Sequence, residues 1–274
     1  MIASVAVVGC GWFGLPLAKA LVKHGYKVSG SKRSEQDAEA LNNEGIAGFA
    51  LDLDCDEYPL VSHEAIASGL ATDAIVINVP PGLRRGDDAY LTRLARLKAL
   101  MGKHTYQRII FISTTGVYAP GSVCTEHDAA AFNAVSETLL AAEGMFSGDN
   151  CTVLRFAGLI GPKRHPGRFL AGRQNVSGGN LAVNLVHLDD CVGAVLALLE
   201  HSGSLSPAYN LSASKHPTKD EFYTLAATQL GLESPSFVDA MQSDDKIVDG
   251  GLITRELNYL YRHDDPLKML AHCD

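Results

Sequence analysis

Short β-branched runs alternate with amphipathic stretches along the first 155 residues, and this alternation limits the fold more than any other feature of the sequence. Runs of four to six apolar residues are typical of strands buried in a parallel sheet. Two of the helical stretches are closed by a glycine, Gly25 and Gly102, as many helices are. The pattern predicts an α/β protein with a doubly wound parallel sheet and right-handed crossovers. The expected strands are Ser4–Val8, Tyr26–Ser29, Gly48–Leu51, Ala74–Asn78, Arg108–Ser113 and Thr152–Phe156, and the expected helices are Phe13–Lys23, Ala89–Met101 and Val135–Phe146.

The pattern changes after Phe156. A glycine- and arginine-rich loop, Gly158–Gly179, precedes a helix at Asp190–Glu200, a strand at Ala208–Leu211 and a helix at Thr218–Leu230. We expect residues 1–157 with 186–212 to form a nucleotide-binding core. Residues 158–185 with 213–274 should form a smaller substrate-binding lobe over the carboxyl ends of the strands. Because no linker-like segment separates them, the two parts are predicted to make one composite domain.

The composition of the chain limits which kinds of molecule it is expected to bind. The chain has 23 basic and 31 acidic side chains, a formal net charge of −8. Such an acidic surface repels nucleic acid and anionic lipid, so neither is expected as a partner and a small molecule is. The six cysteines form no C-x-x-C pair and no cluster with histidine, so the sequence predicts reduced thiols and no metal site. The first 18 residues lack the pattern of a secretion signal, and a cytoplasmic location is expected.

A glycine motif, Gly-Cys-Gly-Trp-Phe-Gly, occupies residues 9–14 between the first strand and the first helix. The first glycine permits a tight turn, the second lets the backbone approach a diphosphate, and the third lets the helix pack on the strand. The helix N-terminus then faces the anion. This arrangement indicates a Rossmann-type dinucleotide site.

The end of the second strand favours NADP over NAD. A site for NAD usually carries an acidic residue there, about 20 residues after the motif, to accept from the ribose 2′-hydroxyl. This chain has Gly30-Ser31-Lys32-Arg33 instead, with no carboxylate before Glu35. A guanidinium such as that of Arg33 donates paired charge-assisted hydrogen bonds to a 2′-phosphate. The alternative is a solvated loop that happens to be basic.

Further cofactor contacts are expected around the same strand ends. Asp52, after the third strand, is placed either to accept from the adenine amino group or to cap a turn. Pro80 opens a Pro-Pro-Gly segment that shapes a loop over the cofactor. The complete expected cofactor set is Gly9, Gly11, Trp12, Phe13, Gly14, Ser31, Lys32, Arg33, Asp52, Pro80 and Ser113.

Several later segments resemble those of the extended short-chain dehydrogenase/reductase superfamily, the NAD-dependent epimerase/dehydratase-like proteins. The closest likeness is to its atypical YeeZ-like branch, which shares the stretch Gly161–Arg168. The resemblance covers nearly all of the chain and implies NAD(P) binding by an oxidoreductase or epimerase-like protein. It also implies a homodimer, because members often pair through helices such as 89–101 and 135–146. The matching segments are Ile110–Tyr118, Leu154-Arg155, Gly158–Pro162, Val186–Asp190 and Tyr209–Leu211.

The catalytic Tyr-x-x-x-Lys pair of that superfamily is missing. Its tyrosine has an unperturbed pKa of about 10 and needs a cation one helical turn away to exchange a proton near neutral pH. The register that the resemblance implies puts Asn133 at the tyrosine position and Glu137 at the lysine position. No Tyr-x-x-x-Lys occurs anywhere in the sequence.

Thr114 matches the serine or threonine whose hydroxyl, in the superfamily, binds the reacting oxygen. Two interpretations follow. In the first, the protein is an enzyme that uses Thr114 with another acid, from among Tyr118, Asp128 and His165. In the second, it is a non-catalytic NADP-binding redox sensor or scaffold, similar to the NmrA-like branch. We favour the enzyme, because positioning and electrostatics survive the loss of one acid. Dehydration is disfavoured, since Thr115-Gly116 replaces the Asp-Glu pair of the dehydratases.

Positive charge gathers in residues 163–173 of this acidic chain, within the segment expected near the substrate. Arg164 and Arg168 are expected to hold an anionic group, such as the phosphate of a nucleotide-sugar or a carboxylate, unless the loop is simply solvated. Arg155 is expected either to touch the substrate or to brace the lobe. His187 completes the expected substrate set, although a buried structural histidine is the stronger interpretation of its apolar surroundings.

Overall fold

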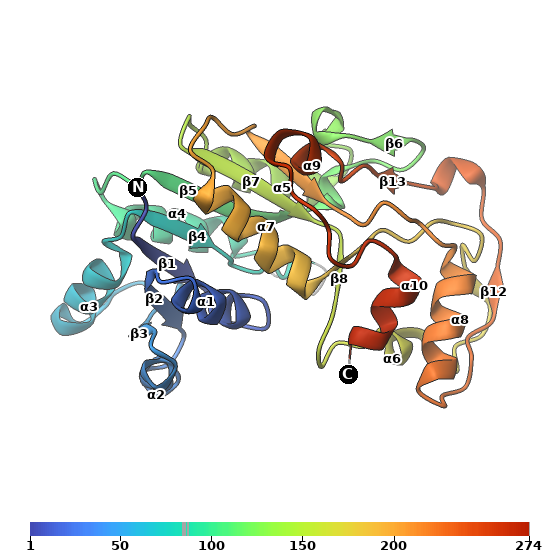
Figure 1. The fold of residues 1–274 in the computed structure, drawn as a ribbon, viewed down its shortest axis with the longest axis horizontal. Helices are drawn as coiled ribbons and strands as arrows, with labels where there is room; N and C mark the ends of the chain where they lie inside the picture. Colours follow the sequence, from blue (N-terminus) through green and yellow to red (C-terminus); the bar gives the residue numbers. More distant parts are fainter. Residues whose placement is uncertain (84–85, 87, 274) are drawn as a thin grey trace. The chain divides into compact units, whose positions relative to one another are not determined.

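The computed structural model describes residues 1–83, 86 and 88–273, and Figure 1 follows the chain through them. Two compact units emerge along the chain. The first comprises residues 1–113, 137–154 and 195–207, and the second comprises 114–136, 155–194 and 208–274. These bounds differ from the core and lobe expected from the sequence, which stay a prediction. Asp274, the last residue of that expected lobe, lies outside the described residues.

A central parallel sheet of seven strands has the order β11-β7-β5-β4-β1-β2-β3. In a doubly wound sheet the strand order reverses beside the first strand, and ligands bind outside the carboxyl ends at that point. Here the reversal lies between β1 and β4, which pair in register from Val5 with Ala74 to Val8 with Ile77. The predicted fold class is confirmed. The strands are β1 Ser4–Val8, β2 Lys27–Lys32, β3 Ala47–Ala50, β4 Ala74–Ile77, β5 Arg108–Thr114, β7 Cys151–Phe156 and β11 Ala208–Leu211.

Helices pack on the strands of the first unit. The glycine-motif helix α1 contacts β1 and β2, while α2 and α3 both contact β3. The contact of α2 with β3 is very close, because a Cβ atom added at Gly48 would lie 1.8 Å from the carbonyl oxygen of Ala38. Residues Val5, Ile75 and Leu17 have no exposed surface, so this packing excludes water. The helices that begin in this unit or cross into it are α1 Gly14–Lys23, α2 Glu35–Ala40, α3 Leu60–Leu70, α4 Tyr90–Met101, α5 Ala134–Met145 and α7 Leu188–Glu200.

Strand β2 is longer than its sequence predicts. It continues past Ser29 to Lys32, because Gly30 pairs with Gly48 and Lys32 pairs with Ala50 on β3. Interstrand pairing of this kind depends on the neighbouring strand rather than on local pattern. The extension carries Ser31 and Lys32 to the carboxyl end of the sheet as ordered backbone.

The second unit contains three small parallel pairs, β8 with β10, β9 with β12 and β6 with β13. The prediction that Gly158–Gly179 is an irregular loop is wrong in part, since the segment contains β8, α6 and β9. Its short strands pair with segments much later in the chain, which local pattern does not reveal. The bounds are β6 Val123–Cys124, β8 Gly158–Ile160, α6 Gly167–Leu170, β9 Val176–Ser177, β10 Leu185–His187, α8 Lys219–Gln229, β12 Phe237–Val238, β13 Ile247–Val248, α9 Leu252–Leu257 and α10 Pro266–Met269.

Helix α8 anchors the hydrophobic core of this unit. Thr218 and Glu221 have the spacing of a capping box in the sequence, and Thr218 caps the helix by accepting a hydrogen bond from the Glu221 backbone N–H at 3.2 Å. The helix buries Phe222 completely in a cluster with Ile160 and Met269. The cluster therefore ties β8, α8 and α10 together within the unit.

Two further observations bear on the environment of the protein. Within the described ranges, none of the helices has the length and apolar character needed to cross a membrane. All six cysteines are free thiols, and five of them are buried. Burial raises the pKa of Cys10 to about 11, so this thiol beside the glycine motif stays protonated at neutral pH.

Candidate functional site

The glycine motif is fixed on both sides by side chains from neighbouring strands. The backbone N–H of Gly9 donates to the Ser31 hydroxyl at 2.9 Å, and Asn78 donates its side-chain amide to the Gly9 carbonyl oxygen at 3.0 Å. Gly9 has φ +93°, which favours glycine, and a Cβ atom there would lie 2.3 Å from the Asn78 carbonyl oxygen. The loop at the switch point is therefore locked before any ligand binds.

The other two glycines of the motif differ in what surrounds them. A Cβ atom added at Gly14 would lie 2.1 Å from the Gly9 carbonyl oxygen, whereas one added at Gly11 would meet nothing within 4 Å. Gly14 is thus required by packing and Gly11 is not. Open space beside an exposed Gly11 at the start of a helix is what close approach of a diphosphate requires. Phe13 is buried and Trp12 is half-buried at the same turn.

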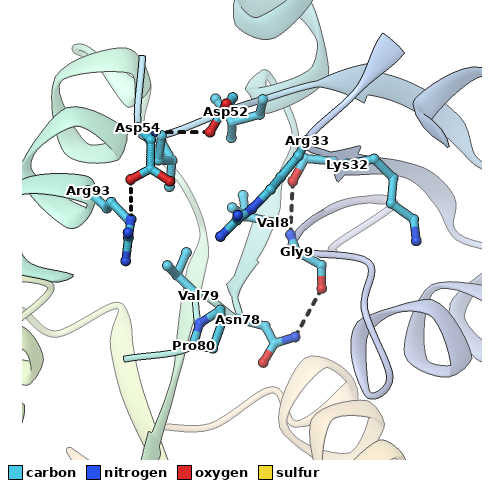
Figure 2. Close-up of a pocket in the computed structure, with 13 residues that line it drawn as sticks. Val8, Gly9, Lys32, Arg33, Asp52, Asp54, Asn78, Val79, Pro80 and Arg93 are labelled. Atoms are coloured by element: carbon cyan, nitrogen blue, oxygen red, sulfur yellow. Dashed lines mark hydrogen bonds and ion pairs between the residues drawn. The ribbon is translucent and has the colours of Figure 1, made fainter. Parts of the chain in front are cut away.

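A pocket opens beside the motif in the first unit (Figure 2). It brings together six of the residues expected to bind the cofactor, Gly9, Ser31, Lys32, Arg33, Asp52 and Pro80. Sequence reasoning missed Asp54, Asn78, Val79 and Arg93, which also line it. Asn78 is the last residue of the predicted strand Ala74–Asn78. Its position at the carboxyl end of a strand is the sequence feature that could have identified it.

Arg33 and Lys32 point in different directions. In Figure 2 the Arg33 side chain extends into the pocket, while Lys32 points away from it. Arg33 is exposed and has no hydrogen bond or ion pair to the rest of the described chain. A carboxylate in the first turn of α2, that of Asp37, accepts from the Ser34 hydroxyl at 2.7 Å and so serves the helix cap. The pocket thus offers a guanidinium at the end of β2 in place of an acid.

The far wall of the pocket is a network of charged side chains. Asp52 accepts from the Asp54 backbone N–H at 3.2 Å, so its carboxylate caps a turn. Asp54 in turn accepts from the Arg93 side chain at 2.6 Å, joining this turn to α4. Of the two roles left open for Asp52, turn capping is realised in the structure.

Ser113 lies outside the lining of this pocket. Its hydroxyl donates to the Glu143 carboxylate at 2.6 Å, and both side chains are buried. Burial and the nearby Glu143 charge raise the pKa of Tyr90. This pair connects β5 to α5 within the first unit, and a cofactor contact from Ser113 stays a prediction.

Thr114 begins a tight turn in the second unit. Its hydroxyl oxygen accepts from the Gly116 backbone N–H at 3.3 Å and caps the 3₁₀ turn Thr115–Val117. Lys246 donates to the carbonyl oxygens of Thr115 and Tyr118 at 3.2 and 3.1 Å. The turn that carries the candidate hydroxyl is therefore held by a cation from a distant segment.

Tyr118 belongs to a buried polar network. Its hydroxyl donates to the Asn210 side chain at 2.6 Å and accepts from Arg155 at 2.8 Å. Arg155 also donates to the Glu126 carbonyl oxygen, and it is buried, so it braces this unit. Burial raises the pKa of Tyr118, and the Arg155 charge only partly offsets this. The phenol is protonated at neutral pH, unlike the activated tyrosine that a Tyr-x-x-x-Lys pair provides.

Asn133, which the predicted register aligns with the tyrosine of the superfamily, caps helix α5. Its side-chain oxygen accepts from the Ser136 backbone N–H at 2.9 Å. The Ser136 hydroxyl reciprocates by accepting from the Asn133 backbone N–H at 3.0 Å. Glu137 is exposed one turn into the helix. In the predicted register, a helix cap therefore occupies the position of the superfamily's acid.

The basic loop is divided between exposed and buried side chains. Arg164 and Arg168 are exposed, and partial burial lowers the pKa of Arg164. His165 is buried, and its Nδ1 accepts from the Gly167 backbone N–H at 3.1 Å at the start of α6. The loop thus presents arginines outward, while His165 faces the interior of its own unit.

His187 is a buried histidine with a full set of contacts, in agreement with the structural interpretation of this residue. Its Nε2 lies 3.1 Å from the His272 carbonyl oxygen, and burial lowers its pKa. The helix predicted to begin at Asp190 begins earlier in the structure. Helix α7 begins at Leu188, and the Asp190 carboxylate accepts from the backbone N–H groups of Arg262 and His263.

Comparisons with known proteins agree with this geometry. Residues 4–84 match the family described as the NAD binding domain of 6-phosphogluconate dehydrogenase. Protein YeeZ of Escherichia coli K12 is 38% identical over 281 residues, covering 97% of this chain and 98% of the relative. A putative NAD-dependent epimerase/dehydratase from Methylobacillus flagellatus has a TM-score of 0.77 at 19% identity, covering 100% and 98% of the two chains. The UDP-glucuronic acid 4-epimerase of Bacillus cereus, in complex with UDP-glucuronic acid and NAD, has a TM-score of 0.76 at 16% identity, covering 98% and 97%.

The contrast between the two glycines leads to a prediction. Gly14→Ala should lower the thermal unfolding midpoint, because its Cβ would collide with the Gly9 carbonyl. Gly11→Ala should leave that midpoint unchanged and weaken NADPH binding at least about tenfold, because its methyl group occupies the space beside the helix start. Calorimetric titration and thermal melts measure both effects. Equal affinity of Gly11→Ala and wild type would mean that the motif does not bind the diphosphate.

Proposed function

Because this chain belongs to the YeeZ branch of the extended short-chain dehydrogenase/reductase superfamily, we propose that it is an NADP-preferring oxidoreductase or epimerase-like enzyme. The chain carries an NAD(P)-binding Rossmann fold. The observation that carries the proposal is the locked glycine motif, with open space at Gly11 and the pocket beside it. A bound nicotinamide dinucleotide would supply or accept a hydride.

The preference for NADP rests on the end of β2. Arg33 enters the pocket without a protein partner among the described residues, and a 2′-phosphate is the anion that a guanidinium at this position fits. No side-chain carboxylate of β2 takes the place of the acid that binds a free ribose in NAD sites. Both features favour a phosphorylated ribose.

Substitution of Arg33 tests this preference. Arg33→Glu should weaken NADPH binding about 10- to 150-fold, because a charge-assisted contact is lost, and should change NADH binding much less. Lys32→Glu is the matched control, since it makes the same change of charge at a neighbouring side chain that points away. If Arg33→Glu lost equal affinity for NADPH and NADH, the result would contradict the phosphate contact. Equal loss of NADPH affinity in Arg33→Glu and Lys32→Glu would contradict it as well.

Thr114 is the hydroxyl that we assign to the reacting oxygen, on the strength of its match to the superfamily position. Tyr118 is a weaker candidate for the acid, because its phenol is fully buried and bonded to Asn210 and Arg155. His165 remains a candidate acid within the basic loop. The second function, a non-catalytic NADP-binding sensor, is favoured by the conversion of the tyrosine position into the Asn133 helix cap.

Turnover distinguishes the two functions. Purified protein should consume NADPH over multiple turnovers with one or more members of a panel of carbonyl compounds, and Thr114→Val should abolish consumption while leaving NADPH affinity unchanged. Emission of Trp12, the single tryptophan, reports that affinity. Tight binding without consumption of NADPH on the whole panel would favour the sensor.

The substrate that we propose is an anionic small molecule such as a nucleotide-sugar. The exposed arginines of the loop, Arg164 and Arg168, support this in a chain of net charge −8. The structure of the Bacillus cereus epimerase contains UDP-glucuronic acid, a ligand of this class. Arg155 and His187 are less suited to contact substrate, because both are buried and already bonded.

Arg168→Ala tests the loop with UDP-glucuronic acid as the probe. Binding should weaken about 10- to 150-fold, because one charge-assisted contact is lost. Lys268→Ala removes an equally exposed cation of the same unit and should have no effect. Unchanged affinity in Arg168→Ala would remove this loop from the binding site. Titration calorimetry measures all three proteins.

The cellular compartment and the oligomeric state of the protein stay predictions. Free thiols at all six cysteines support a cytoplasmic location, where thiols remain reduced. A homodimer through α4 and α5 rests on the resemblance to the superfamily. Neither a nucleic acid nor a membrane is proposed as a partner.

A further inference from the structure

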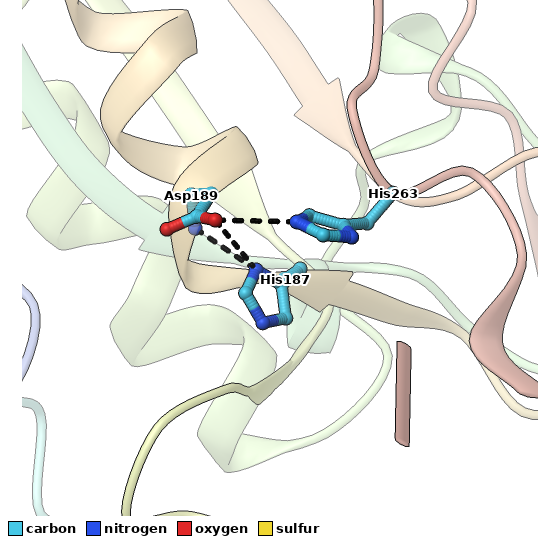
Figure 3. A group of neighbouring side chains, drawn as sticks. All are labelled: His187, Asp189 and His263. Carbon is cyan, nitrogen blue, oxygen red and sulfur yellow. Dashed lines mark hydrogen bonds and ion pairs between the residues drawn. The ribbon is translucent and has the colours of Figure 1, made fainter. Parts of the chain in front are cut away.

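Two histidines and an aspartate converge in the second unit, outside the features used above (Figure 3). His187 ends β10, Asp189 lies in the first turn of α7, and His263 comes from the segment between α9 and α10. Their ligand atoms, His187 Nδ1, a carboxylate oxygen of Asp189 and His263 Nε2, all lie within 4.8 Å of one another. His263 is more than 70 positions from Asp189 in the sequence, yet its Nε2 faces the carboxylate of Asp189.

Hydrogen bonds fix the tautomer of His187. A carbonyl oxygen only accepts, so Nε2, which lies 3.1 Å from the His272 carbonyl, carries the proton. A backbone N–H only donates, and that of Asp189 points at Nδ1 over 3.2 Å, so Nδ1 holds the lone pair. An imidazole whose far nitrogen donates to a backbone carbonyl is oriented as metal-binding histidines are.

The spacing of the three atoms fits a small tetrahedral cation. The Asp189 carboxylate oxygen lies 3.7 Å from His187 Nδ1 and 3.2 Å from His263 Nε2. Ligand distances to zinc of about 2.0–2.2 Å place neighbouring tetrahedral ligands about 3.3–3.5 Å apart. Two of the three spacings are thus within a few tenths of an ångström of that value.

The surroundings hold two ligands in place and leave the third accessible. Asp190 accepts from the backbone N–H of His263 at 3.1 Å and so positions the segment that carries this ring. The His187 side chain is almost fully buried, whereas 43% of the Asp189 side chain is exposed, which gives an ion a route in. Arg262 lies 3.6 Å from the Asp189 carboxylate, but its side chain is largely exposed and can move aside.

We propose that His187 Nδ1, the Asp189 carboxylate and His263 Nε2 bind a zinc ion, with water as the fourth ligand. Histidine nitrogens with one carboxylate are a ligand set that zinc accepts. The ion replaces the long contact from the Asp189 N–H to His187 and the ion pair of Asp189 with Arg262. It joins the β10–α7 junction to the C-terminal segment and stabilises this unit. The sequence predicts no metal site because His263 is too far along the chain from His187 and Asp189 to form a motif with them.

Zinc binding by the purified full-length chain tests the proposal. A metal-free sample in a Cys55→Ser background, which removes the exposed thiol, should bind one Zn²⁺ per chain in competition with a chromophoric chelator. Zn²⁺ should raise the thermal midpoint, and a chelator should reverse the rise. Co²⁺ in place of Zn²⁺ should give the intense visible absorption of a tetrahedral site.

Variants of the ligands decide whether the ion binds at this cluster. Asp189→Asn and His263→Gln should each weaken Zn²⁺ binding about 100-fold or more. Loss of an outer-shell partner typically weakens metal binding about 10- to 100-fold, and loss of a direct ligand should cost more. His63→Gln, which changes an exposed histidine on α3, should bind as the parent does. Circular dichroism checks that each variant is folded. The proposal would be overturned if the parent bound no Zn²⁺. It would also be overturned if folded Asp189→Asn and His263→Gln bound Zn²⁺ as tightly as the parent.

Discussion

The contact between three backbone segments at the end of β1 is the constraint on which the dinucleotide site depends. Gly9 lies so close to Asn78, and Gly14 so close to Gly9, that no side chain fits at either glycine. Hydrogen bonds from Gly9 to Ser31 and from Asn78 to Gly9 then fix the loop from both neighbouring strands. A loop that is rigid before binding loses little entropy when a ligand arrives.

The proposed dinucleotide site has the expected glycine motif, whereas the residues predicted to align with the proton-transfer pair of the superfamily differ from that pair. At the expected tyrosine position, the side chain of Asn133 caps helix α5. The tyrosine that remains nearby in sequence, Tyr118, is buried beside Arg155 and has a raised pKa. A neighbouring cation brings the pKa of a phenol below its ordinary value only when the effect of the charge is larger than the effect of burial. For Tyr118 the effect of burial is larger. Any proton transfer would therefore depend on a different group, such as His165 of the basic loop.

Long-range polar contacts hold the C-terminal segment in the second unit. Asp190 is buried at the start of α7 and accepts from the backbone of Arg262 and His263, and Tyr259 donates to it as well. Burial raises the pKa of Asp190, and these hydrogen bonds partly compensate by favouring the charged form. The same segment brings His263 against Asp189 and His187, so the support for the backbone also assembles the proposed zinc ligands.

Local chemistry in the sequence determined the alternating strands and helices, the glycine motif, the Thr218 helix cap and the basic end of β2, because periodicity, turn preference and capping act over a few residues. Only the tertiary structure decided that Ser31 supports the glycine loop, that Arg33 rather than Lys32 enters the pocket, that Asp190 binds a distant backbone, and that His187, Asp189 and His263 meet. Each of these depends on which strand ends and segments become neighbours in space, and side-chain direction at such a meeting is set by packing rather than by the order of residues.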